Sequence, residues 1–87
     1  MKTNRKEMRK LLNKVSALQK EAFDCGLNME ISTRLKTEHD LPWIVGYVWE
    51  EGHIEDREEF HCYEWRDIKK NEEEIEKIEQ IIKNYKK

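Results

Sequence analysis

The apolar residues near both ends of this sequence recur every three or four positions. Two sets share this spacing: Met8, Leu11, Val15, Leu18, Ala22 and Cys25 in the first stretch, and Ile75, Ile78, Ile82 and Tyr85 in the last. The spacing places each set on one stripe of an α-helix. Most of the aromatic residues lie in between, where the apolar period is that of a β-strand. The pattern predicts two amphipathic helices that bracket a small antiparallel sheet.

The first helix is expected to run from Arg5 to Asp24. Asn4 is followed three residues later by Glu7, which is the spacing of a capping box. Gly26 suits the left-handed position that commonly closes a helix. Leu12 and Phe23 widen the apolar stripe, which is typical of a helix that packs on a sheet or in a bundle.

The last helix has similar signals at its start. Asn71 and Glu74 have the spacing of a second capping box, and the acidic run 72–74 falls in the first turn. The lysines near its end complement the negative pole of the helix dipole. The segment 65–70 is compatible either with a tight connection or with an extra helical turn.

Three strands are expected between the helices. Residues 27–35 alternate between apolar and polar side chains, as in a half-buried strand. Residues 43–50 are rich in aromatic and β-branched types, and the third strand covers 59–65. The polar segments 36–42 and 51–58 are expected to be connections.

The middle strand is apolar on both of its alternating sides. Trp43, Val45, Tyr47 and Trp49 share one side, and Ile44 and Val48 share the other, where Gly46 leaves room for a neighbouring ring or a bulge. The alternation therefore leaves open which side meets the helices. The expected core comprises Leu11, Val15, Leu18, Ala22, Ile31, Val45, Ile75, Ile78 and Ile82.

The fold class that follows is α+β, with the order α-β-β-β-α, in a single domain over residues 1–87. Charged residues make up 41% of the chain, so the core is small relative to the conformational entropy lost on folding. Self-association or docking onto a larger partner would offset that deficit.

A three-stranded sheet with both helices on one side leaves its other side uncovered. On strand 59–65, Phe60 and Cys62 alternate with His61, Tyr63 and Trp65, so that side carries an apolar surface whichever way the strands face. We expect this surface to bind a partner protein or a second copy of the chain through Trp43, Tyr47, Trp49, Tyr63 and Trp65. The alternative is that a loop or a helix folds over it.

The segment around 51–58 is strongly acidic. Glu55, Asp56, Glu58 and Glu59 would take part in partner binding by docking onto a basic groove of a larger protein. The opposing interpretation is that these charges only keep the hairpin soluble and protect it from edge pairing. The leading functional hypothesis is a small non-enzymatic protein–protein interaction module, acting as an adaptor, an inhibitor or a homo-oligomer.

The alternative hypothesis is nucleic-acid binding. Residues 1–20 contain seven basic residues against one acid, whereas 50–79 contain thirteen acids against five bases. The basic band that could follow a phosphate backbone comprises Arg5, Lys6, Arg9, Lys10 and Lys14. The two opposite charges can instead attract each other, within one chain or between two copies.

The order of elements is similar to that of the double-stranded-RNA-binding domain. In that family a lysine-rich opening of the last helix grips phosphates. The corresponding segment here, 71–74, reads Asn-Glu-Glu-Glu. This departure removes the feature on which that family's binding depends, so its function is not carried over.

The sequence gives no support for catalysis, a metal or another cofactor. His39, His53, His61, Cys25 and Cys62 lack the paired close spacings of structural zinc sites. Adjacent His61 and Cys62 point to opposite faces of a strand, and Cys25 lies at a helix C-terminus, whereas reactive cysteines favour helix N-termini. No phosphate-binding loop or metalloprotease motif occurs.

Two cysteines are too few for a disulfide scaffold, so free thiols in a reducing compartment are expected. The basic, polar opening does not resemble a secretory signal, and no run of about twenty apolar residues could span a bilayer. The expected location is the cytoplasm, with no membrane partner.

Overall fold

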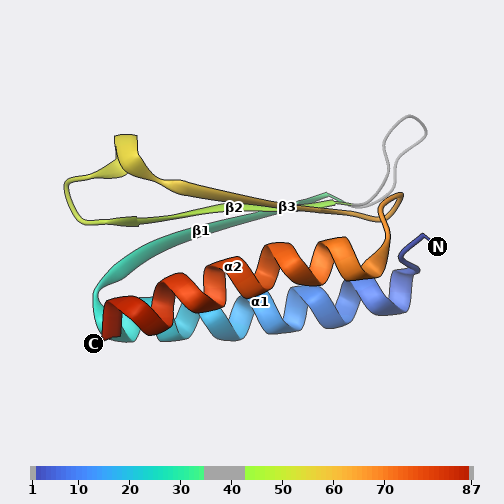
Figure 1. The fold of residues 1–87 in the computed structure, drawn as a ribbon, viewed down its shortest axis with the longest axis horizontal. Coiled ribbons are helices and arrows are strands. Elements are labelled where there is room, and N and C mark those ends of the chain that lie inside the picture. The colour runs from blue at the N-terminus through green and yellow to red at the C-terminus, as the bar shows by residue number, and fades with distance from the viewer. Residues whose placement is uncertain (1, 35–42, 87) are drawn as a thin grey trace.

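The computed structural model describes residues 2–34 and 43–86. Its elements are, in order, α1 (Arg5–Cys25), β1 (Leu27–Arg34), β2 (Trp43–Glu50), a 3-10 turn η1 (Ile54–Asp56), β3 (Glu58–Tyr63) and α2 (Ile68–Lys86). The strands form one antiparallel sheet in the order β1-β2-β3, and both helices lie on the same side of it (Figure 1). The α+β class and the α-β-β-β-α order predicted from the sequence are confirmed. The predicted loop 36–42, together with Leu35 and His39, lies outside the described residues.

The predicted caps of α1 are confirmed. The Glu7 backbone N–H donates to Asn4 Oδ1 at 2.8 Å, and the Asn4 N–H donates to Glu7 Oε1 at 2.9 Å. Gly26 takes the left-handed conformation with φ 91°, which only glycine adopts without strain, and its N–H reaches the last-turn carbonyls. The chain can therefore turn directly from α1 into β1.

The capping box predicted at Asn71 is wrong, and of the two alternatives for 65–70 the helical one is observed from Ile68 onward. The helix begins at Ile68 rather than after Asn71, and the carboxylate of Asp67 accepts the Lys69 N–H at 2.8 Å. That hydrogen bond lowers the pKa of Asp67. Glu74 is not used in a capping box, because its Oε1 accepts the His61 N–H of β3 at 2.9 Å.

Asn71 is instead a fully buried hydrogen-bonding centre. Its Oδ1 accepts the Tyr63 N–H at 3.1 Å, and its Nδ2 donates to the Tyr63 carbonyl at 2.8 Å and to Thr3 Oγ1 at 2.9 Å. Thr3 Oγ1 in turn donates to the Arg66 carbonyl at 2.7 Å. This network ties the residues before α1 to the first turn of α2. Both helices start at that end of the molecule and run in the same direction (Figure 1).

The core lies between the helices and the inner face of the sheet. The expected residues of both helices are buried there, and Ile31 packs against them while staying partly exposed. The prediction that Val45 belongs to the core is wrong, because Val45 is half-buried and lies on the outer face. The strands contribute Leu27, Ile44, Val48, Phe60 and Cys62.

Gly46 explains why the side of β2 that carries Ile44 and Val48 faces inward. It pairs with Phe60 of β3, and a Cβ added at Gly46 would lie 2.6 Å from Cζ of the Phe60 ring and would also collide with the Glu30 carbonyl oxygen. The ring of Phe60 therefore fills the space that a side chain on β2 would have taken. This confirms the prediction that Gly46 makes room for a neighbouring ring.

Candidate functional site

The candidate site is the outer face of the sheet. The register pairs Trp43 with Tyr63, Val45 with His61 and Tyr47 with Glu59, so all of these share the side opposite to Phe60. Both helices lie on the other side, and no segment among residues 2–34 and 43–86 covers this face (Figure 1).

Along β3 the aromatic rings form a stacked row. The ring centroids of His61 and Tyr63 lie 6.2 Å apart with an interplanar angle of 11°. Those of Tyr63 and Trp65 lie 5.1 Å apart at 15°. Trp65 comes from the turn after β3, not from the predicted longer strand, and is 52% exposed. The row ends in an indole ring that is largely open to solvent.

Arg66 fixes the position of this row. Its guanidinium carbon lies 4.8 Å from the Tyr63 ring centroid and 5.5 Å from that of Trp65. The same side chain donates from Nη1 to the His61 carbonyl at 2.8 Å. Cation–π contacts and a charged hydrogen bond therefore hold the rings in place before any partner arrives.

Along β2 a second aromatic row comprises Trp43, Tyr47 and Trp49, all half-buried. The guanidinium carbon of Arg57 lies 5.1 Å from the Tyr47 ring centroid. On β1 the outer positions are polar, including Asn28 and Glu30, so the apolar surface is concentrated over β2 and β3.

The structure thus brings the five predicted aromatic residues onto one face. The sequence interpretation missed Arg57 and Arg66 as members of this surface, because both lie outside the strands and follow no alternation. His61 could have been included, since it shares the alternation of Tyr63.

The predicted acidic residues gather at the hairpin end of the sheet, but only Glu59 shares the outer side of the strands with the aromatic rings. Glu58 pairs with the inner residue Val48, and Asp56 and Glu58 line a hollow beside α2. Glu55 and Asp56 belong to η1, Glu58 begins β3, and Glu59 lies on the outer face beside Tyr47. All four are exposed. They form a charged rim at the hairpin end and do not extend across the aromatic rows.

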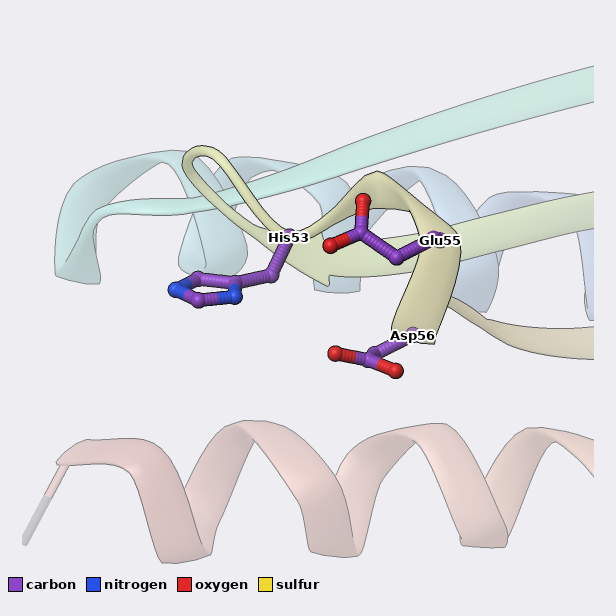
Figure 2. A group of neighbouring side chains, drawn as sticks. All are labelled: His53, Glu55 and Asp56. Atoms are coloured by element: carbon purple, nitrogen blue, oxygen red, sulfur yellow. The ribbon is translucent and has the colours of Figure 1, made fainter.

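The same hairpin brings three potential metal ligands together. Ligand atoms of His53, Glu55 and Asp56 all lie within 4.8 Å of one another, and Figure 2 shows the imidazole and the two carboxylates around a common gap. All three residues are exposed to water. Exposed groupings of this kind are common on acidic surfaces, so the cluster alone does not define a metal site.

The thiol of Cys62 is not suited to nucleophilic chemistry. It is fully buried and donates to the Asn71 carbonyl at 3.5 Å. Burial, with a smaller contribution from the nearby Glu74 carboxylate, raises the pKa of Cys62 to about 12. His61 and Cys62 lie on opposite faces, as predicted. The partly buried Cys25 thiol donates to the Ala22 carbonyl at 3.4 Å.

The basic residues of α1 lie partly beside acids. Lys10 and Lys14 line one groove together with Glu72 and Glu76 of α2. Arg5 Nε lies 4.0 Å from Glu64 Oε2. Lys6 and Arg9 are exposed. Opposite charges therefore meet within the chain, which is one of the two arrangements expected from the sequence.

No protein-family model, curated protein or solved structure matches this chain. Neither of the described helices combines the length and the apolar character needed to cross a lipid bilayer. The fold and the candidate site define a small α+β protein with an aromatic outer sheet face and an acidic rim.

Proposed function

We propose that this protein is a small non-enzymatic interaction module that binds a larger protein through its outer sheet face. The observation that carries the proposal is the pair of aromatic rows, Trp43–Trp49 on β2 and His61–Trp65 beside them, on a face that no described segment covers. Contiguous exposed apolar surface of this kind usually marks contact with another molecule.

The composition of the face supports high-affinity contact. Tryptophan, tyrosine and arginine are the residue types in which binding energy concentrates. Arg66 already holds Tyr63 and Trp65 in a stacked geometry, so little side-chain entropy would be lost when a partner packs on them.

The acidic rim indicates the chemistry of the partner. The exposed carboxylates of Glu55, Asp56 and Glu59 would attract a surface whose apolar groove is bordered by lysine or arginine. Such rim charges act mainly on the association rate and on orientation. The aromatic rows would provide most of the binding free energy.

Nucleic-acid binding through α1 is the second candidate, supported by the exposed Lys6 and Arg9. We rank it lower because Lys10 and Lys14 share a groove with Glu72 and Glu76, which weakens the local positive potential.

The test is affinity capture from source cells with nuclease treatment, followed by affinity measurement on the captured protein. We expect Trp49→Ala and Trp65→Ala each to weaken binding at least about tenfold, because tryptophan is among the residue types in which binding energy concentrates. The matched control is Phe23→Ala, which removes an exposed aromatic ring from α1, on the other side of the sheet.

Equal affinity of both tryptophan variants and the wild type would refute the outer-face proposal. If nuclease treatment abolishes capture, and Lys6→Glu with Arg9→Glu abolishes retention on nucleic acid, the second candidate replaces it.

A further inference from the structure

The two edges of the sheet differ in how their outward backbone groups are used. On β3, Asn71 bonds both the N–H and the carbonyl of Tyr63, and Glu74 accepts the His61 N–H. Arg66 donates to the His61 carbonyl and Lys77 donates to the Glu59 carbonyl at 2.7 Å. Side chains from α2 and from the turn before it therefore close this edge against further strand pairing.

Within residues 2–34 and 43–86, the edge of β1 is open except at the Met29 carbonyl. The backbone groups of His61 and Tyr63 point away from β2, and in an antiparallel sheet the direction of these groups alternates along each strand. Following the register across β2, the residues of β1 whose backbone groups point outward are Leu27, Met29, Ile31 and Thr33. Among the hydrogen bonds of the described residues, only the Met29 carbonyl has a partner, the Gln19 Nε2 at 2.9 Å. An open edge eight residues long is a template for another strand.

On the flank of α1 beside this edge, four uncharged residues form a stripe, and Lys20 and Asp24 lie next to it. Leu12, Ser16, Gln19 and Phe23 follow one another at steps of four, three and four, which places them on one helical stripe. The hydrogen bond from Gln19 to Met29 locates the stripe along the β1 edge, and Phe23 lines a hollow there with Leu27 and Met29. Phe23 is 81% exposed, more than any other large hydrophobic residue that is described.

The stripe is symmetric about its middle. The apolar residues, Leu12 and Phe23, lie at its ends, while Ser16 and Gln19 lie at its centre. Gln19 contacts Met29, so the middle of the stripe lies near the middle of β1. A two-fold axis through this point would place α1 antiparallel to α1 of a second copy, and β1 antiparallel to β1 of that copy. Phe23 of each copy would then lie opposite Leu12 of the other.

We infer that the β1 edge and this α1 stripe pair with a second copy of the chain. The two sheets would join through β1 into one six-stranded sheet, and the outer faces of both copies would lie on the same side. A register centred on Met29 or Ile31 avoids placing the two Glu30 carboxylates directly opposite each other. This interface is separate from the outer face of the proposed function, and it leaves that face open.

Analytical ultracentrifugation across a concentration series tests the inference. The wild type should reach twice its monomer mass of 10.7 kDa. Phe23→Glu should raise the dimer dissociation constant at least about tenfold, because the new charge would be buried against Leu12 of the other copy. The matched control is Ala17→Glu, which adds the same charge at an exposed position on a different face of α1.

Ile31→Pro gives an independent readout of the strand edge. Its outward N–H is not used in the pairing with β2, so the substitution should block dimerisation while the circular dichroism spectrum is retained. Amide exchange in the wild type should show concentration-dependent protection at Met29, Ile31 and Thr33.

A wild type that stays monomeric at about 100 µM would overturn the inference. It would also fail if Phe23→Glu dimerises like the wild type, or if Trp49→Ala abolishes the dimer while Phe23→Glu does not. That last result would place self-association on the outer face instead.

Discussion

The two sides of β2 are both apolar in sequence, yet the fold treats them differently. On the inner side, Ile44 and Val48 keep only 3% and 2% of their surface exposed. On the outer side, Trp43, Tyr47 and Trp49 are larger but remain half-buried. The difference shows that the hydropathy of a strand does not by itself determine which side becomes the core.

The neighbours of β2 determine that choice. Phe60 and Cys62 of β3 have no strongly polar group, and the ring of Phe60 fits over Gly46. The opposite side of β3 carries His61 and Tyr63, whose ring nitrogen and hydroxyl group favour a face that reaches water. Away from the strand end, where Glu58 lies, the inner side of β3 therefore carries no strongly polar side chain.

Replacing Phe60 with alanine should give the largest contrast between the two sides. Loss of a fully buried ring leaves a cavity and should lower the free energy of unfolding by about 3–5 kcal/mol. Tyr47→Ala on the outer side should cost less than about 1 kcal/mol, because its ring is only half-buried. Urea denaturation followed by circular dichroism measures both, and equal losses would contradict the assignment of the faces.

Gly46→Ala should have the next largest effect, about 2 kcal/mol, because the new Cβ would collide with the Glu30 carbonyl oxygen and overpack the ring of Phe60. In the double variant with Phe60→Leu, the cost of the alanine should fall in part, since the smaller side chain relieves the collision with the ring and leaves the one with the backbone. A double-mutant cycle measures this coupling. Strictly additive effects would mean that the ring is not what excludes a side chain at position 46.

The pH dependence of stability should show a smaller effect from Cys62. Burial raises the pKa of this thiol from 9.0 to about 12, so its contribution is fully present below pH 9 and is lost as the pH rises toward 12. The expected loss is roughly 1 kcal/mol by pH 10, relative to Cys62→Ala. Thermal unfolding of the wild type and of Cys62→Ala at pH 8, 9 and 10 tests it.

Local signals in the sequence were sufficient for most of the fold. The capping box of α1 and the Gly26 turn depend on neighbouring residues, and the structure confirms both. The start of α2 could not be found in the same way. Asn71 has the spacing of a cap, but its side chain bonds Thr3 and Tyr63, and Thr3 lies far away in sequence.

The candidate face was predictable only in part. The alternation in β2 and β3 places Trp43, Tyr47 and Tyr63 together once the inner side is known. The contacts of Arg57 and Arg66 with these rings depend on turns, whose geometry the alternation does not specify. The open edge of β1 was likewise not predictable, because the backbone groups without partners can be identified only when the register of the strands is known.

The hydrogen bonds between Thr3, Arg66 and Asn71 also determine the order of folding during synthesis, because they join the start of the chain to its last helix. A ribosome adds all three strands before it adds α2, so for that interval the inner sheet face lacks Ile75, Ile78 and Ile82, and Thr3 lacks its partner Asn71. The nascent chain therefore keeps part of its inner sheet face exposed until α2 has been translated. Only then can the residues before α1 form their hydrogen bonds with Asn71.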